Sequence, residues 1–284
     1  MSRYDIAIIG TGPAGLEAAL TAKIRKKNIL LLGSKNSSLK VQKAHTIENY
    51  LGLPHISGED MQKTFLNQIK ENEIEITEDQ VVSVYNMTDY FMIQTKNTYY
   101  EASTVILATG VTTAKPYPNE EELLGKGVSY CATCDAPLYK GKTAAVISTN
   151  KEEESEAVFL KEYAEKVLYF PLYNEEVSDM KDVMIIHEKP TEIIGNSKVE
   201  KLKTEFNEYT VDGVFILRES VAPKQLVPGL ETDGPHVKVN LDMSTNIPGV
   251  FACGDIAGLP YQYIKSAGQG NVAALSAVKY LVSK

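Results

Sequence analysis

Residues 4–15 read YDIAIIGTGPAG, and this motif indicates the fold of the chain. It begins with a short apolar run, which is typical of a buried parallel strand, and a helix-like segment follows at residues 16–24. In the Gly-x-Gly-x-x-Gly between them, Gly10 permits a tight turn, Gly12 lets the backbone approach a pyrophosphate, and Gly15 lets the helix pack on the strand. The N–H groups at the start of the helix would then face the phosphates. The stretch therefore predicts a dinucleotide-binding α/β domain.

The remaining apolar runs extend this pattern along the chain. The next strand, residues 28–32, ends at Gly33, where a plain NAD site would place a ribose-binding acid. Further strands are expected near residues 81–86, 90–95, 98–101, 104–110 and 249–255, and helices at about 59–71 and 268–282. At 284 residues the chain is long enough for two domains with proper cores.

Two cysteines near the middle of the chain form a Cys-x-x-Cys pair, Cys131 and Cys134. Such a pair reacts only if a neighbour makes one sulfur a thiolate or protonates the leaving sulfur. Asp135 follows directly and is a candidate proton carrier, although it could instead cap a turn before Pro137. The pattern favours a redox-active dithiol.

Two other interpretations of the cysteine pair are less favoured. A structural zinc site needs four ligands, and only Cys253 and four scattered histidines remain, so no metal site is expected. A static disulfide is disfavoured because the chain is expected to be cytoplasmic and so short a ring restrains little.

The composition is that of an ordinary globular protein, with 43% apolar and 23% charged residues. No secretory signal and no apolar run long enough to span a bilayer is visible, so a cytoplasmic location without membrane insertion is predicted. The net charge of −8 argues against nucleic acid as a partner.

One stretch of the chain is basic. Residues 21–43 hold seven basic side chains and no acidic one: Lys23, Arg25, Lys26, Lys27, Lys35, Lys40 and Lys43. They fit either a solvated helix end and loop or a docking patch for an acidic protein.

The motifs TGPAG, ENY, LATG, YCATCD and ACGD, with SAGQGNVAALSA after them, closely resemble the low-molecular-weight thioredoxin reductases from about residue 4 to residue 281. In that family a glycine also stands at the position of Gly33. The resemblance implies a two-domain FAD-dependent disulfide reductase that forms a homodimer. It implies a Rossmann-like FAD domain at residues 1–113 and 242–284, and a smaller inserted α/β domain at 114–241 that carries the redox cysteines.

The resemblance also implies roles for single residues. Cys134 would face the flavin, Cys131 would attack the protein partner, and Asp135 would carry the proton. Asn49 would lie near the isoalloxazine and Gln262 at its pyrimidine edge, whereas Cys253 matches no catalytic position and fits a small core residue. The residues expected at the cofactor are Gly10, Gly12, Pro13, Ala14, Gly15, Asn49, Thr109, Gly110, Gly254, Asp255 (at the ribityl or phosphate portion), Tyr261 and Gln262.

The central segment departs from the NADPH-dependent members of this family, which carry a second glycine fingerprint there. Here the strand at residues 143–147 is followed by STNKEEE, residues 148–154, so side chains occupy the turn where backbone must approach a pyrophosphate. The acidic residues 152–154 would repel a phosphate; read instead as a solvated helix start, they would exclude a dinucleotide equally. Residues 171–173 read Pro-Leu-Tyr where those members carry a histidine and two arginines, so no guanidinium is left for a 2′-phosphate.

A third departure lies beside the expected flavin. The family shows Arg-Gln-Ala where this chain has Tyr261-Gln262-Tyr263. Either tyrosine could stack on the flavin face that nicotinamide would otherwise use, or both could pack against a neighbouring element.

The whole pattern resembles the flavin-dependent ferredoxin:thioredoxin reductases more closely than the NADPH enzymes. A flavin can accept two electrons one at a time, so a one-electron protein donor is chemically reasonable. The resemblance implies FAD as cofactor, reduced ferredoxin as donor and thioredoxin as substrate. Two alternatives stay open: an NAD(P)H-dependent reductase with an atypical nucleotide site, and a non-catalytic FAD-binding redox sensor or scaffold.

Overall fold

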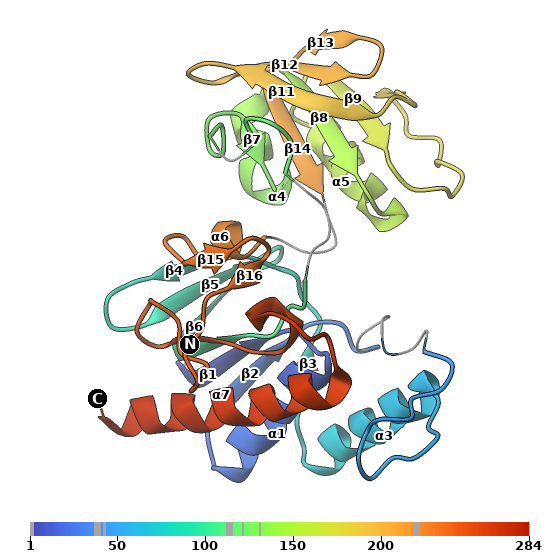
Figure 1. Cartoon of the computed structure of the whole chain (residues 1–284). Coiled ribbons are helices and arrows are strands. Elements are labelled where there is room, and N and C mark those ends of the chain that lie inside the picture. The colour runs from blue at the N-terminus through green and yellow to red at the C-terminus, as the bar shows by residue number, and fades with distance from the viewer. Residues whose placement is uncertain are drawn as a thin grey trace. The chain divides into compact units, whose positions relative to one another are not determined.

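The chain forms two compact units, each with its own sheet and hydrophobic core (Figure 1). Unit 1 comprises Met1–Thr113 and Ala222–Lys284, and unit 2 comprises Ala114–Val221. The computed structural model describes residues 3–36, 41, 44–111, 116–120, 122–130, 132–217 and 222–283, with only the backbone of residues 133 and 134. The predicted two-domain α/β fold class is confirmed.

Unit 1 is built around a seven-stranded sheet in the order β3-β2-β1-β6-β5-β4, with β17 paired to β6. Its strands are β1 (Tyr4–Ile9), β2 (Ile29–Leu32), β3 (Ile76–Thr77), β4 (Val81–Asn86), β5 (Phe91–Thr95), β6 (Tyr99–Leu107) and β17 (Val250–Ala252), with a separate hairpin of β15 (Thr232–Asp233) and β16 (His236–Val237). Its helices are α1 (Pro13–Ile24), α3 (Gly58–Glu71), α6 (Pro223–Leu226) and α7 (Tyr263–Ser283), and a 3₁₀ turn η3 spans Gly254–Ala257.

The long strand β6 brings three strand ends together. On one edge it pairs in parallel with β1, and its other edge is shared: residues 99–102 pair antiparallel with β5, and residues 105–107 pair in parallel with β17. The sequence pattern predicted two strands here, but the backbone stays extended while its partner changes, so there is one. Because Ile9, Leu107 and Ala252 are in register, the loops that follow β1, β6 and β17 meet at one edge of the sheet.

Helices α1 and α7 lie side by side and share one core with the sheet (Figure 1). The prediction that the final helix begins at about residue 268 is wrong, because α7 begins at Tyr263. Its glycines do not end it: a Cβ at Gly270 would lie 2.1 Å from the carbonyl oxygen of Ala14, so this glycine allows α7 to approach α1 closely.

The predicted boundary at residue 241 also differs from the structure, which groups residues 222–241 with unit 1. Helix α6 contacts β4, and β16 contacts η3. The side chain of Asn246 accepts a hydrogen bond from the amide of Glu231 (2.9 Å) and donates one to the carbonyl of Gly229 (2.9 Å). These contacts, rather than any change in composition, tie the segment to unit 1.

Unit 2 contains a parallel five-stranded sheet in the order β10-β9-β8-β14-β7 and an antiparallel sheet of β11, β12 and β13. Its strands are β7 (Val128–Ser129), β8 (Thr143–Ser148), β9 (Lys166–Pro171), β10 (Val183–Ile185), β11 (Pro190–Gly195), β12 (Val199–Thr204), β13 (Glu208–Thr210) and β14 (Gly213–Leu217). Its helices are α4 (Ala132–Asp135) and α5 (Glu154–Lys161), with 3₁₀ turns η1 (Ala136–Tyr139) and η2 (Lys151–Glu153).

The parallel sheet of unit 2 is buried on both faces. Along β8, Ala144 and Val146 pack with residues of α4 and α5, whereas Ala145 and Ile147 pack with residues of β11 and β12. Successive side chains of a strand point to opposite faces, so one strand serves two cores. This explains why β8 reads as a continuous apolar run.

Candidate functional site

The glycine turn after β1 is built around glycines at which there is no room for a Cβ. Gly10 has φ of +115°, and a Cβ there would lie 2.3 Å from the carbonyl oxygen of Ala108. A Cβ at Gly15 would lie 1.8 Å from the carbonyl oxygen of Gly10, so only glycine lets α1 start so close to β1. Gly12 is the N-cap of α1 and offers no capping side chain, and the first turn of this helix has no acidic residue. The N–H groups of this helix start suit a phosphate.

The turn after β17 lies against the same helix start. Gly254 has φ of +83°, and a Cβ there would be 2.9 Å from the Cβ of Ala14. The next residue, Asp255, is half-buried, and its Oδ1 accepts a hydrogen bond from the Ser266 hydroxyl at 3.2 Å. The amide of Gly254 donates to Oε1 of Gln269 at 3.0 Å. The first turns of α7 therefore hold the turn that carries Asp255.

Two of the residues expected at the flavin ring meet across most of the sequence. The amide Nδ2 of Asn49 donates to Oε1 of Gln262 at 2.7 Å. The neighbouring Tyr261 is 45% exposed, and its hydroxyl shares a 2.6 Å hydrogen bond with Nε2 of His236 on β16. The contact of His236 with Tyr261 was not predicted, because the two residues are 25 positions apart and no local pattern relates them.

The third loop at this edge follows β6. Its residues Thr109 and Gly110 are half-buried, and Gly110 has φ of +71° with open space where a Cβ would stand. The loops after β1, β6 and β17 thus surround the carboxyl ends of parallel strands, the place where open α/β sheets bind nucleotides. The residues present fit the pyrophosphate of a dinucleotide such as FAD.

The end of β2 agrees with the absence of a ribose-binding acid. A Cβ at Gly33 would lie 2.8 Å from Cγ2 of Thr11, so a larger residue would force the two loops apart. The hydroxyl of Thr11 donates to the carbonyl of Ser34 at 2.8 Å, so the Thr11 side chain fills the space beside Gly33 at the end of β2.

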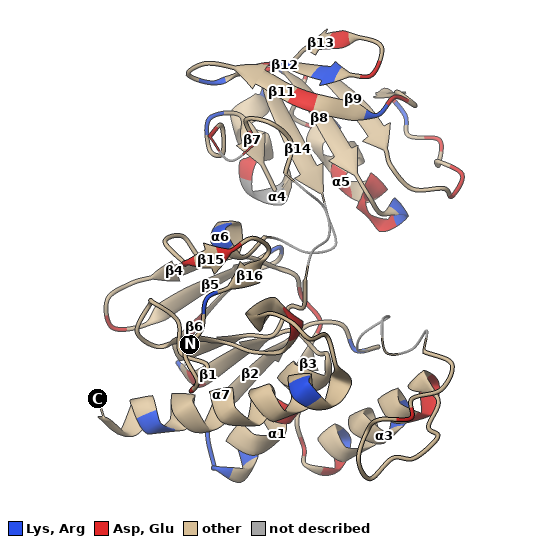
Figure 2. Cartoon of the chain, viewed as in Figure 1, with Lys and Arg blue, Asp and Glu red and all other residues tan. Residues whose placement is uncertain are grey.

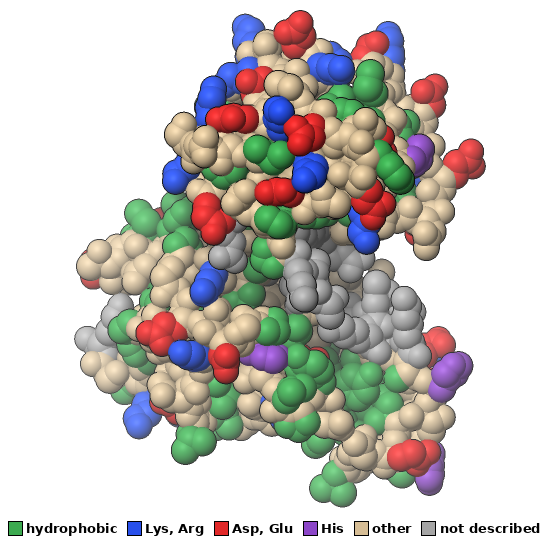
Figure 3. All heavy atoms as spheres, turned by 45° about the horizontal axis from the view of Figure 1, so that its top comes forward, with side chains coloured by type: hydrophobic (Ala, Val, Ile, Leu, Met, Phe, Trp, Pro, Cys, Tyr) green, Lys and Arg blue, Asp and Glu red, His purple; other side chains and the backbone are tan. Residues whose placement is uncertain are grey.

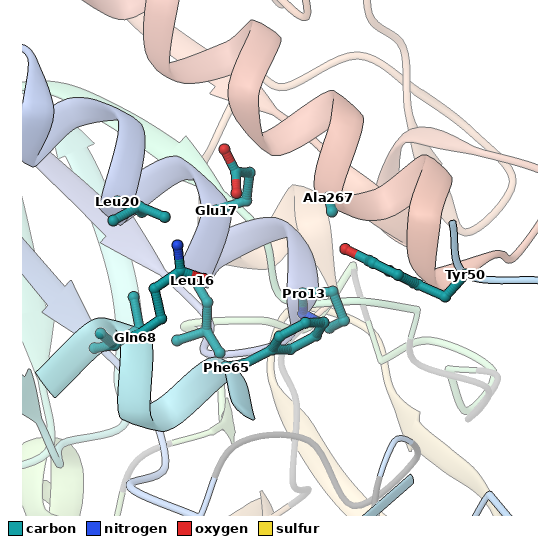
Figure 4. A pocket seen from close by; sticks show the side chains of 9 residues that line it. Pro13, Leu16, Glu17, Leu20, Tyr50, Phe65, Gln68 and Ala267 are labelled. Carbon is teal, nitrogen blue, oxygen red and sulfur yellow. The ribbon is translucent and has the colours of Figure 1, made fainter. Parts of the chain in front are cut away.

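A cavity near the glycine turn is not the dinucleotide site. Figure 4 shows it between α1, α3 and the start of α7, lined by Pro13, Leu16, Glu17, Leu20, Tyr50, Phe65, Gln68, Ile69 and Ala267. Its volume of about 70 Å³ suits about two water molecules and is far below that of a cofactor pocket. Burial and the nearby Glu17 carboxylate raise the pKa of Tyr50.

The redox segment of unit 2 is described in part. Cys131 and the side chain of Cys134 lie outside the described residues. Asp135 ends α4 and is half-buried, and it lies near Tyr139, whose pKa is raised to about 12 by burial, with further contributions from Asp135 and Asp212. A partly exposed carboxylate at this position suits a proton carrier.

The residue before Cys131 is anchored by a buried carboxylate that the sequence did not single out. The Tyr130 hydroxyl donates to Oε1 of Glu120 at 3.0 Å, and the amide of Tyr117 donates to Oε2 at 2.7 Å. Glu120 is fully buried, and its carboxylate joins the chain entering unit 2 to the start of the cysteine segment.

The turn after β8, where a second dinucleotide would bind, is filled by its own side chains. The Ser148 hydroxyl donates to the carbonyl of Asn150 at 2.7 Å and accepts from the amide of Asn150 at 3.2 Å. The Asn150 side chain then caps the following 3₁₀ turn by accepting from the amide of Glu152 at 3.0 Å. A donor that a phosphate would use is therefore satisfied within the chain.

The two halves of that turn region are also bonded to each other. Glu154, which begins α5, accepts a hydrogen bond from the Tyr173 hydroxyl just beyond β9 (2.5 Å) and one from the amide of Ser178 (3.2 Å). The Tyr173 hydroxyl also contacts that of Tyr169 at 3.1 Å. A solvated helix start does not describe this segment, because Glu153 and Glu154 are both 7% exposed. A dinucleotide would have to break this network.

The basic side chains of residues 21–43 that the structure describes do not form one patch. Arg25, Lys26 and Lys27 lie at the C-terminal end of α1 (Figure 2), about 18 Å from the glycine turn for a helix of 12 residues. Lys35 lies beyond the other end of β2, 3.8 Å from Glu78, and Lys40 and Lys43 lie outside the described residues.

Cys253 lies in the core of unit 1, as predicted. Its side chain is fully buried, and burial raises the pKa of its thiol to about 12, although the nearby Lys265 ammonium acts in the opposite direction.

Among the described residues, no helix has the length and apolar character needed to cross a bilayer.

Comparison with known proteins matches residues 4–149 and 162–270 to the family described as pyridine nucleotide-disulphide oxidoreductase. The thioredoxin reductase of Aquifex aeolicus is 33% identical and aligns with 99% of this chain and 94% of its own. A crystal structure of a ferredoxin-flavin thioredoxin reductase from Clostridium acetobutylicum is 52% identical, covers 100% of this chain and 99% of its own, and superposes with a TM-score of 0.89. A thioredoxin reductase from Gloeobacter violaceus is 28% identical, covers 99% and 95%, and has a TM-score of 0.80. The chain therefore belongs to the pyridine nucleotide-disulphide oxidoreductase family, among its FAD-dependent thioredoxin reductases.

Proposed function

We propose that this chain is a ferredoxin-dependent thioredoxin reductase: it reduces a thioredoxin disulfide through Cys131 and Cys134, with electrons from reduced ferredoxin through FAD. The observation that carries the proposal is the contrast between two turns. The turn after β1 has glycine at positions 10, 12 and 15, and the first turn of α1 has no acidic residue. The turn after β8 has no glycine, and Glu154 and Tyr173 are hydrogen-bonded across it. The likeness to the ferredoxin-flavin enzyme of Clostridium acetobutylicum supports the same donor.

Unit 1 is the proposed flavin domain. FAD, when bound, supplies a carrier that takes up electrons singly and passes them on as a pair. Asn49 and Gln262, which are hydrogen-bonded to each other, would hold the ring, and Asp255, which Ser266 holds, would bind the ribityl or phosphate portion. The half-exposed Tyr261 would be available to stack on one ring face. The pyrophosphate is bound by backbone of the glycine turn and its neighbours, namely Gly10, Gly12, Pro13, Ala14, Gly15, Thr109, Gly110 and Gly254.

The chain's own chemistry takes place at the cysteine pair of unit 2. Two electrons and two protons open the Cys131–Cys134 disulfide to a dithiol, and Asp135 carries a proton. The Cys131 thiolate then attacks the thioredoxin disulfide, forming a mixed disulfide and releasing one thiolate of thioredoxin. Attack by Cys134 on Cys131 releases the second thiolate and restores the disulfide. The net result is one thioredoxin disulfide reduced to two thiols.

The test is anaerobic. The visible absorption of the bound flavin is followed after addition of NADPH, and in a separate sample after addition of reduced ferredoxin. We expect bleaching by ferredoxin alone. Bleaching by NADPH, with thioredoxin reduced at its expense, would restore the NAD(P)H-dependent reductase with an atypical nucleotide site.

A non-catalytic redox sensor or scaffold is distinguished by the cysteines. In Cys131→Ser or Cys134→Ser, ferredoxin should still bleach the flavin, whereas turnover of thioredoxin should stop. A biological output unchanged by either substitution would favour the scaffold.

We also propose a cytoplasmic homodimer. One face of α7 supports a partner surface, because Ile264, Val272, Leu275 and Val282 are 42%, 37%, 44% and 79% exposed and recur at helical spacing. Light scattering after gel filtration tests the dimer, and a monomer at micromolar concentration would overturn it.

On the face seen in Figure 3, acidic and basic side chains are interspersed over unit 2.

A further inference from the structure

The helix α7 contributes one side chain to the Asp255 turn that neither the motifs nor the comparisons single out. The ammonium of Lys265 donates hydrogen bonds to the carbonyl oxygen of Gly254 at 2.9 Å and to that of Gly258 at 2.5 Å. These two carbonyls stand at the two ends of η3, so a single side chain closes the turn from both sides.

The backbone of this turn loses much conformational freedom on folding, and the hydrogen bonds from Lys265 offset that cost. Gly254 and Gly258 have φ of +83° and +110°, a region that glycine enters readily. Glycine also loses more conformational freedom on folding than any other residue, so ordering this turn is costly. Within the turn, the amide of Gly258 donates to the carbonyl of Asp255 at 3.0 Å. The charged donor on two carbonyls is a stronger restraint, because hydrogen bonds from an ammonium are roughly twice as strong as neutral ones.

The electrostatic setting of Lys265 is unusual for a lysine. The side chain is half-buried, and burial lowers the pKa of its ammonium, whereas the nearby Asp255 carboxylate raises it. Moving an ammonium out of water costs free energy unless its N–H groups donate hydrogen bonds within the protein. The carbonyls of Gly254 and Gly258 accept such bonds, so the lysine and the turn stabilise each other.

We propose that Lys265 is a positioning residue for the cofactor: its ammonium fixes the 254–258 turn so that Asp255 and the turn's backbone face the flavin nucleotide. The proposal rests on the proposed function only in taking the glycine-rich edge of unit 1 as the FAD site. Lys265 itself acts through the backbone of the turn that carries Asp255, whose carboxylate is held by Ser266.

The test measures FAD binding in the absence of any electron donor or thioredoxin, so failure of the ferredoxin reaction does not affect it. Lys265→Met removes the charge at similar length, Lys265→Arg keeps a cation, and Lys279→Met removes an exposed lysine from the same helix. For each variant, the FAD dissociation constant of the apoprotein, the melting temperature without and with FAD, and the visible spectrum of the bound flavin are recorded.

Lys265→Met removes both charge-assisted hydrogen bonds. We expect it to raise the FAD dissociation constant about tenfold to hundredfold, which corresponds to the loss of one of them in FAD binding, with the remainder falling on the stability of the apoprotein. The FAD-induced rise in melting temperature should shrink accordingly, Lys265→Arg should recover most of the affinity, and Lys279→Met should behave as the native protein. A dissociation constant within about twofold of the native value, with a lower melting temperature of the apoprotein, would mean a purely structural clasp and overturn the proposal. If Lys265→Met does not fold, Lys265→Gln, which keeps a neutral donor, is measured in its place with the same two outcomes.

Discussion

Replacing Glu154 by Gln tests whether the second nucleotide site has closed on itself. Its carboxylate is 7% exposed and accepts hydrogen bonds from the Tyr173 hydroxyl at 2.5 Å and from the Ser178 amide at 3.2 Å. Glutamine has nearly the same shape, so the substitution removes the charge and leaves no cavity. The change therefore isolates the electrostatic part of the closure.

The expected loss follows from the two hydrogen bonds. A hydrogen bond to a charged group contributes about 1.5–3 kcal/mol, and a neutral one about 1 kcal/mol. Because the amide oxygen of Gln can keep weaker bonds to the same donors, we expect unit 2 to lose about 2–3 kcal/mol of stability. In a domain of roughly 100 residues this corresponds to a melting temperature lower by about 10–20 °C.

The loss should depend on pH with a definite sign. Burial raises the pKa of Glu154, but the hydrogen bonds from Ser178 and Tyr173 together outweigh burial, and the net pKa is lowered. A lowered pKa means that the carboxylate stabilises the fold above its unfolded pKa and that this contribution is lost as the pH falls through the folded pKa. The difference between Glu154→Gln and the native protein should therefore be full at pH 7 and shrink below about pH 4.

Hydrogen exchange is the appropriate assay, because it reports the stability of unit 2 separately from that of unit 1. Amides of β8 and β9 should exchange faster in Glu154→Gln, whereas those of β1 and β6 should not change. Glu152→Gln is the matched control, since Glu152 lies two residues away and is exposed. If the two variants exchange alike at pH 7, Glu154 does not pin the turn, and the reasoning that excludes a nucleotide there is refuted.

Three further predictions concern unit 1. Gly270→Ala should lower the free energy of unfolding and the FAD content, because its Cβ would lie 2.1 Å from a backbone oxygen of α1. Gly268→Ala on the same helix meets open space and should raise the free energy of unfolding in urea by up to about 1 kcal/mol. Equal losses in the two variants would contradict this packing. Cys253, with a pKa raised to about 12, should resist iodoacetamide at pH 8 in the folded protein and react after unfolding, as measured by mass spectrometry. Charge reversal at Lys26 and Lys27 should slow ferredoxin-driven turnover, most visibly at low salt, because salt screens the attraction between exposed charges. No change at either ionic strength would remove this stretch from the docking surface.

Much of unit 1 could be predicted because its signals are local. The glycines of the turn are only two to five positions apart, and apolar runs predicted β1, β2 and the end of β6. The helix predicted near residues 59–71 is α3, which Ser57 caps by accepting a hydrogen bond from the amide of Asp60 at 3.1 Å. A turn, a cap and a buried strand are each specified by neighbours in the chain.

Local signals misled where a residue serves a distant partner. The sequence pattern predicts a final helix from about residue 268, whereas α7 begins at Tyr263, and its Gly270 lies against the Ala14 carbonyl of α1. Residues 222–241 carry no compositional boundary, and the hydrogen bonds of Asn246 decide that they pack with unit 1. In both cases the deciding contact joins segments that periodicity does not relate.

The α/β class, the glycine turn, the cysteine pair and the absence of glycines and arginines at the expected places of the central domain can all be recognised from the sequence. The folded chain was needed to show that Asn49 meets Gln262 across 213 residues, that Glu154 accepts a hydrogen bond from Tyr173 across the turn after β8, and that Lys265 donates to the backbone of the Asp255 turn. An absent residue is evident from its neighbours in the chain, whereas the side chains that fill its place come from separate strands and helices and meet only when the chain folds.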